Sequence, residues 1–109
     1  MELTETGLLD IELQDVEGEK VEFIDDDGQV EKIVKALSSK TRREILRYIR
    51  DGPKDVSSIA SELDMTEANI SAQIKKLEEA RLITCDYSSG LHGVRKISKL
   101  KAQQLLISF

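Results

Sequence analysis

The segment from Val56 to Ile97 constrains the fold of this chain more than any other part of its 109 residues. Its first stretch, Val56–Leu63, carries apolar residues at the spacing of one buried helical stripe. After the polar break Asp64-Met65-Thr66, a second stretch of about four turns repeats that spacing, with the apolar residues Ile70, Ile74 and Leu77. The segment therefore predicts two helices joined by a tight turn.

The second of these helices, expected to be capped by Thr66 and to end near Ala80-Arg81, turns a face without bulky side chains away from the core. That face carries Ala68, Ser71, Ala72 and Lys75. Small residues, a hydroxyl and a cation can enter a DNA major groove without steric or like-charge penalty. We expect Ser71 to contact base edges or phosphate and Lys75 to contact phosphate. Ala68 and Ala72 would then allow close approach to thymine methyl groups. The alternative is a solvated helix face with no partner.

Glu67 lies at the start of the same helix, where an acid has two roles open to it. It could accept a hydrogen bond from a cytosine, or it could simply stabilise the positive end of the helix dipole. The dipole role is the one we favour.

A basic hairpin follows the second helix. Leu82–Tyr87 predicts a strand with Ile83, Cys85 and Tyr87 on one face, Ser88–Gly93 a flexible tip, and Val94–Ile97 the return strand. We expect His92 of the tip and Arg95 and Lys96 of the return strand to reach backbone phosphates or the adjacent minor groove. A polar hairpin that contacts only water is the alternative. A turn, a helix and then a basic hairpin is the order of a winged helix-turn-helix, which makes the predicted class α+β.

Two helices are predicted before this segment. Gln29–Leu37 has an apolar stripe, and Lys40–Arg50 begins after a serine pair that can cap it. The start of the second helix gathers a possible phosphate site from its free N–H groups and its side chains, namely Lys40, Thr41, Arg42 and Arg43. A charged helix face is often only solvated, so both interpretations stay open.

Charge divides the chain sharply. Residues 1–31 hold 12 acids and one cation, a net of −11, whereas residues 32–109 hold 15 cations and 9 acids, a net of +6; the sum is the overall −5. This asymmetry is typical of a nucleic-acid-binding body with an acidic appendage. We therefore divide the chain into an acidic arm (1–28), a DNA-binding domain (29–98) and a C-terminal segment (99–109).

The arm and the C-terminal segment leave alternatives open. Alternating residues predict a strand over Leu8–Leu13 and a weaker one over Val21–Ile24, although repulsion among the acids could leave the arm disordered. The C-terminal segment has helix formers in its first half, while Leu105–Phe109 could pair as a strand with the arm. The arm either completes a sheet at a dimer interface or competes with DNA for the basic face.

Composition argues against several other classes of protein. No run approaches the roughly 20 apolar residues of a membrane span, and the acidic start is no signal peptide. The single cysteine, Cys85, excludes an internal disulfide and suits a reducing cytoplasm, and we expect it to act as a small buried hydrophobe. One His and one Cys make a metal site improbable, and neither a phosphate loop nor a nucleophile–base pair indicates an enzyme or a cofactor.

Three stretches resemble the ArsR-type repressors: residues Ala36–Leu46 (ALSSKTRREIL), Val56–Leu63 (VSSIASEL) and Ile70–Ile83 (ISAQIKKLEEARLI). The likeness covers about residues 30–98, and the wing resembles members without metal sites. It implies a symmetric dimer that binds an operator and usually represses. Metal-sensing relatives carry paired cysteines where this chain has serines and alanine, which argues against a metal sensor. Ala72 and Gln73 replace the usual recognition-helix histidines, so no operator sequence is implied.

A homodimer would place two recognition helices in successive major grooves of a pseudopalindromic operator, about 34 Å apart. The residues that we expect at the dimer interface come from the first predicted helix and the C-terminal segment: Val30, Ile33, Val34, Leu37, Leu105, Ile107 and Phe109. The rival hypothesis is a protein–protein adaptor of the transcription machinery that keeps the winged fold without reading DNA.

Overall fold

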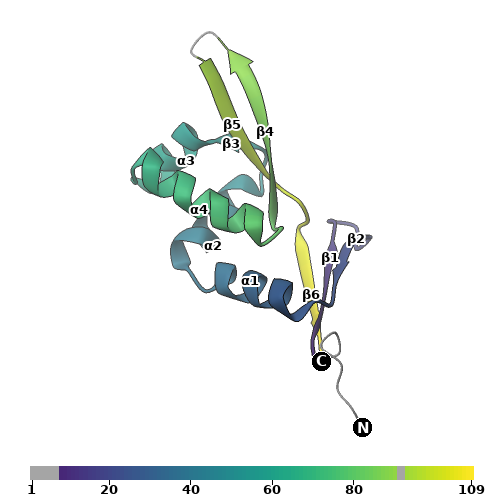
Figure 1. Cartoon of the computed structure of the whole chain (residues 1–109). Coiled ribbons are helices and arrows are strands. Elements are labelled where there is room, and N and C mark those ends of the chain that lie inside the picture. The colour runs from purple at the N-terminus through teal and green to yellow at the C-terminus, as the bar shows by residue number, and fades with distance from the viewer. Residues whose placement is uncertain (1–7, 91–92) are drawn as a thin grey trace.

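A computed structural model describes residues 8–90 and 93–109 of the chain and confirms the α+β class. Four helices pack together beside two small sheets, and the β4–β5 hairpin projects away from the end where the terminal strands lie (Figure 1). In chain order the elements are β1 (Asp10–Gln14), β2 (Lys20–Ile24), α1 (Asp27–Leu37), α2 (Lys40–Ile49), β3 (Lys54–Asp55), α3 (Val56–Leu63), α4 (Glu67–Glu79), β4 (Ile83–Gly90), β5 (Gly93–Leu100) and β6 (Gln104–Ser108). This is the arrangement of a winged helix-turn-helix.

Every helix begins at a capping side chain. The oxygens of Asp26, Ser39, Asp55 and Thr66 each accept a hydrogen bond from the backbone N–H three residues later. Such caps satisfy N–H groups that the helix itself leaves unpaired, which fixes where each helix can start. Ser39 and Thr66 were expected in this role.

Helix α1 begins two residues earlier than the sequence predicted. Asp26 is its cap and Asp27 lies in its first turn, where an acid interacts favourably with the helix dipole. The acidic residues just before Gln29, assigned above to the arm, therefore form the start of the helix. Buried Gln29 also donates from its side-chain amide to the carbonyl of Glu79 at 3.3 Å, which joins α1 to the end of α4.

The paired strands of the wing are longer than expected. Strands β4 and β5 pair from Ile83 and Leu100 up to Gly90 and Gly93, so residues 88–90, expected in the tip, belong to the ladder. A short third strand, β3, pairs with β5 through Lys54 and Ser98 and was missed because a two-residue strand carries no periodicity. The sheet order β3-β5-β4 fixes the base of the wing to the start of α3.

The terminal strands form a second sheet in the order β2-β1-β6. Residue Ile11 lies opposite Ile24 and Ile107, and Leu13 lies opposite Leu105. The structure thus resolves both open alternatives: residues 10–14 and 20–24 are strands, and the C-terminal segment ends in a strand that pairs with β1. The ladder begins at Asp10 and not at Leu8, two residues later than expected.

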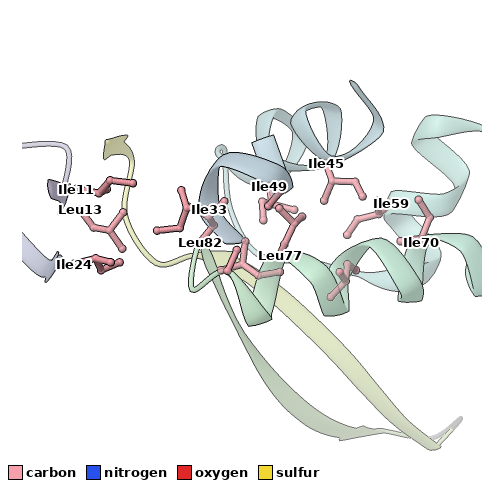
Figure 2. Packing of buried hydrophobic residues seen from close by; sticks show 14 of the residues in the cluster. Ile11, Leu13, Ile24, Ile33, Ile45, Ile49, Ile59, Ile70, Leu77 and Leu82 are labelled. Carbon is pink, nitrogen blue, oxygen red and sulfur yellow. The ribbon is translucent and has the colours of Figure 1, made fainter. Parts of the chain in front are cut away.

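One buried cluster runs from this sheet through the helices (Figure 2). Ile11 and Leu13 of β1 are 0% and 1% exposed and belong to the same cluster as Ile33, Ile70 and Leu77. Burial of one such side chain stabilises a fold by roughly 1.5–3 kcal/mol. The three-part division of the chain stays a prediction, with the qualification that the first and last parts share a sheet and contribute to one core.

Over residues 8–90 and 93–109, no helix has both the length and the apolar character that a membrane span requires.

Candidate nucleic-acid interface

The outward face of α4 is as open as the sequence predicted. Ile70, Ile74 and Leu77 are fully buried, whereas Ala68, Ser71, Ala72 and Lys75 are all exposed. In the described part of the chain, Lys75 forms no ion pair. We call these four exposed residues the α4 face. Its chemistry is two methyl groups, one hydroxyl and one free ammonium group on a rigid helix.

The turn before α4 sets the angle at which the α4 face is presented. Asp64 adopts a left-handed conformation with φ of 54°, and the N–H of Met65 donates to the carbonyl of Ala60 at 2.9 Å. The Ser57 hydroxyl donates to a carboxylate oxygen of Glu67 at 2.5 Å, which ties the first turn of α3 to the first turn of α4. Glu67 therefore has a contact between the helices in addition to its favourable place at the helix dipole.

Arg42 was expected to hold a DNA phosphate, and the structure gives its guanidinium three contacts inside the chain. The group donates to the carbonyls of Ala36 at 2.8 Å and Lys35 at 3.1 Å, which closes the end of α1. It also donates to the side-chain oxygen of Gln73 at 2.8 Å, and Gln73 in turn donates to Asn69 at 3.1 Å. This chain of polar contacts fixes α4 against α1 and α2. The sequence carries no sign of this role for Gln73 and Asn69, because no local pattern connects Gln73 with Arg42, 31 positions away.

The other residues at the start of α2 differ in how free they are. Arg43 is exposed, yet its guanidinium donates to the carbonyl of Leu37 at 2.8 Å. Thr41 is half-buried. Lys40 is exposed and, in the part of the chain that the structure describes, has no ion-pair partner. The four residues therefore do not form one free phosphate site, and Lys40 has the fewest internal commitments.

Acids of the body hold Arg95 and Lys96, the two wing cations that were predicted to contact DNA. The Lys96 ammonium lies 2.6 Å from a carboxylate oxygen of Glu78, near the end of α4, and this hydrogen bond raises the pKa of Lys96 above its ordinary value. Arg95 lies 2.9 Å from Asp55, the residue that caps α3. Hydrogen bonds from Ser58 and the charge of Arg95 lower the pKa of Asp55. His92 lies outside the described residues.

Cys85 is half-buried in β4, and its sulfur lies 3.4 Å from the hydroxyl of fully buried Ser98. Burial raises the pKa of the Cys85 thiol, so the unreactive thiol form is favoured at neutral pH. Among the residues that the structure describes, no three His, Cys, Asp or Glu side chains form a group that could hold a metal ion.

The residues expected at a dimer interface separate into two groups. Val30 and Ile33 are 4% and 0% exposed, so their side chains already pack inside the single chain. Val34, Ile107 and Phe109 are exposed, whereas Leu37 and Leu105 are half-buried. A partner could therefore reach Val34 on α1 and the end of β6, but not the whole predicted stripe of α1.

The sequence matches a model of the arsR family of bacterial regulatory proteins over residues 39–84. It is 32% identical to an uncharacterized HTH-type transcriptional regulator of Methanocaldococcus jannaschii, over 66% of this chain and 76% of that protein. The fold is similar to that of a crystallised ArsR family transcriptional regulator, with 30% identity and a TM-score of 0.57 over 66% of this chain and 75% of the other. It is also similar to a homodimeric winged helix-turn-helix DNA-binding domain from Mycobacterium bovis, a possible ArsR-family regulator, with 25% identity and a TM-score of 0.61 over 69% of this chain and 66% of the other.

Proposed function

Because this chain belongs to the ArsR family of transcriptional regulators, we propose that it binds double-stranded DNA with the α4 face and represses transcription as a homodimer. The observation that carries the proposal is the chemistry of that face. Its four side chains are exposed, three of them are small, and none of them forms an ion pair with the described residues. Small outward side chains that carry no negative charge let a helix approach base edges without steric or like-charge penalty.

Within the α4 face, the residue roles follow from side-chain chemistry. The Ser71 hydroxyl can both donate and accept, so it contacts a base edge or a phosphate oxygen. Ala68 and Ala72 pack against thymine methyl groups. Lys75 binds phosphate, which contributes affinity without sequence preference. Glu67 keeps its hydrogen bond from Ser57 and supports the turn between α3 and α4.

At the flanks of α4, two kinds of residue cooperate. Lys40 and Arg95 contact phosphates directly, and Arg95 is 61% exposed, so it can exchange Asp55 for a phosphate. Arg42 acts through Gln73 by holding α4 in place. Lys96 keeps its contact with Glu78 and braces the wing, and His92 at the wing tip is assigned to the minor groove from the sequence alone.

The homodimer is proposed from the exposed apolar residues and from the homodimeric relative of Mycobacterium bovis. Val34, Ile107 and Phe109 are the exposed members of the predicted interface. A two-fold contact there would carry two α4 helices to half-sites about 34 Å apart on a pseudopalindrome.

A gel shift with genomic fragments at increasing salt concentration tests the proposal. We expect the wild type to bind, with an affinity that falls steeply as salt rises because phosphate contacts release counterions. The double variant Lys75→Ala/Arg95→Ala should bind at least about tenfold more weakly and show a shallower salt slope. Lys20→Ala on β2 is the matched control and should bind as the wild type does. Unchanged affinity in a folded double variant would remove the assigned site.

An adaptor that binds protein in place of DNA is the second candidate, and the ion pairs of the wing favour it. Arg95 and Lys96 are already neutralised by Asp55 and Glu78, which lowers the positive potential available to a polyanion. If the wild type binds neither random nor genomic DNA at low salt, the adaptor is the remaining candidate.

A further inference from the structure

A groove of about 640 Å³ lies between α2 and the segment that leads from β5 into β6. Its volume is within the range of roughly 300–1,000 Å³ that small-molecule sites occupy. No residue of α4 lines it, so it is separate from the α4 face. Base recognition by the α4 face therefore does not account for the groove.

The groove joins an apolar floor to a cationic rim. The floor is formed by Leu37, Leu46, Leu82, Leu100, Ala102 and Leu105. Along one side, α2 and its C-terminal cap contribute a row of cations at spacings of three and four residues, which places them on one helix face: Lys40, Arg43, Arg47 and Arg50. Among the residues that the structure describes, Glu44 is the single acid that lines the groove, so the rim keeps a positive excess.

Two of the four cations are not committed inside the described part of the chain. Arg43 donates to the carbonyl of Leu37, and Arg50 lies 3.7 Å from Asp51. Lys40 and Arg47 form no ion pair with any described residue. An apolar floor that ends at free positive charges is complementary to a molecule with an apolar body and an anionic head. The floor removes the apolar body from water, and the cations form charge-assisted hydrogen bonds with the head.

A second copy of the chain fits this groove less well. In a two-fold contact the same patch faces itself, so a contact centred on the groove would place the α2 row opposite its own image. Like charges placed opposite one another oppose association. Of the residues expected at the dimer interface, Leu37 and Leu105 line the groove. The exposed ones that are assigned above to the dimer, Val34, Ile107 and Phe109, do not line it.

We propose that this groove binds a single-chain amphiphilic carboxylate, with the head at Arg47 of α2 and the hydrocarbon chain over the leucine floor. The head accepts hydrogen bonds from the cations at the rim, where water can still solvate its outer side. The hydrocarbon chain covers apolar surface that the fold leaves open to solvent.

Calorimetric titration of the full chain with decanoate, below its micelle concentration and without DNA, tests the proposal. We expect saturable binding of one decanoate per chain. Acetate, which lacks the hydrocarbon chain, and 1-decanol, which lacks the charge, should bind at least about tenfold more weakly. Absence of saturable decanoate binding, or equal binding of 1-decanol, overturns the proposal.

Two variants locate the site. Arg47→Gln removes a head-group contact and should weaken decanoate binding about fivefold, while Lys99→Gln, which removes an exposed cation of the wing, should leave it unchanged. Ala102→Phe fills the groove and should abolish binding while circular dichroism shows the wild-type fold. If both groove variants bind decanoate as the wild type does, the site lies elsewhere and the proposal is wrong.

Sedimentation equilibrium of the same variants distinguishes a second copy from a small molecule in the groove. The proposal expects Arg47→Gln and Ala102→Phe to have the same state of association as the wild type. Dissociation of both variants, with Lys99→Gln unchanged, would assign the groove to a partner copy and overturn the proposal. None of these measurements involves DNA, and Arg47 and Ala102 are outside the proposed DNA contacts, so failure here leaves the proposed regulator untouched.

Discussion

The α4 face and the terminal sheet differ in how much each contributes to the stability of the fold. The side chains of the α4 face are exposed, whereas Ile11, Leu13 and Ile24 of the terminal sheet are buried in the common core. Ion pairs also hold the sheet to the rest of the chain, because Glu22 on β2 pairs with Arg81 at 3.0 Å and with Lys101. Removal of the α4 face should therefore cost function and little stability, while removal of the sheet contacts should cost stability first.

The sharpest way to break this comparison is Leu13→Ala in β1. We expect the free energy of unfolding to fall by about 2–5 kcal/mol, because a fully buried leucine leaves a cavity when truncated. Chemical denaturation measures it. The matched control is Leu106→Ala on β6, the strand that pairs with β1. The Leu106 side chain is 50% exposed, so its truncation should lower the free energy of unfolding much less. Equal effects of the two variants would mean that β1 does not contribute to the core.

Glu22→Gln tests the clamp between the arm and the body. Burial raises the pKa of Glu22, but hydrogen bonds and charge from Lys101 and Arg81 outweigh it and leave the pKa below its ordinary value. The variant should lose about 1–2 kcal/mol of unfolding free energy at neutral pH. Glu17→Gln, in the turn between β1 and β2, serves as the control and should match the wild type.

The same clamp has a pH signature. Because the pKa of Glu22 is lower in the folded chain than in the unfolded one, its contribution is present above the ordinary pKa and is lost as the pH falls through the folded pKa. Denaturation curves at pH values from 7 down to 3 should therefore show a wild-type loss of stability on acidification that Glu22→Gln reduces. If wild type and variant depend on acidity in the same way, Glu22 is not held as described.

Lys96→Met tests the brace between the wing and α4. The pKa of Lys96 is raised, so its contribution is complete at neutral pH and disappears only as the pH rises through the folded pKa. Loss of the 2.6 Å contact with Glu78 should cost about 1 kcal/mol of unfolding free energy at neutral pH. Lys99→Met, whose ammonium lies 3.8 Å from the exposed Asp86, should cost less. A larger loss for Lys99→Met would contradict the brace.

Ser71→Ala should have the smallest effect on stability, within about 0.5 kcal/mol of the wild type. Its DNA affinity should nevertheless fall about fivefold at fixed salt, because one hydrogen bond to a base edge or phosphate is lost. A gel shift beside the denaturation curve measures both quantities. A large loss of stability would show that the α4 face also supports the fold, which would remove the contrast with the terminal sheet.

Local patterns predicted most of the fold. The four helices, the caps Ser39 and Thr66 and the strands of the wing follow from periodicity and from single residues at element ends, because these depend on neighbours within a few positions. The α4 face was predicted for the same reason. The family resemblance was also read from sequence, and the comparisons confirm it.

What each cation and each apolar side chain contacts was decided only by tertiary structure. Arg42, Arg95 and Lys96 looked alike in sequence as surface cations, yet their partners lie 31, 40 and 18 positions away. In the same way, Val30 and Val34 share one predicted stripe, but the core covers Val30 and leaves Val34 exposed. Periodicity determines which way a side chain points from its own helix. Only the packing of distant elements determines whether that side chain contacts an acid, a carbonyl or solvent.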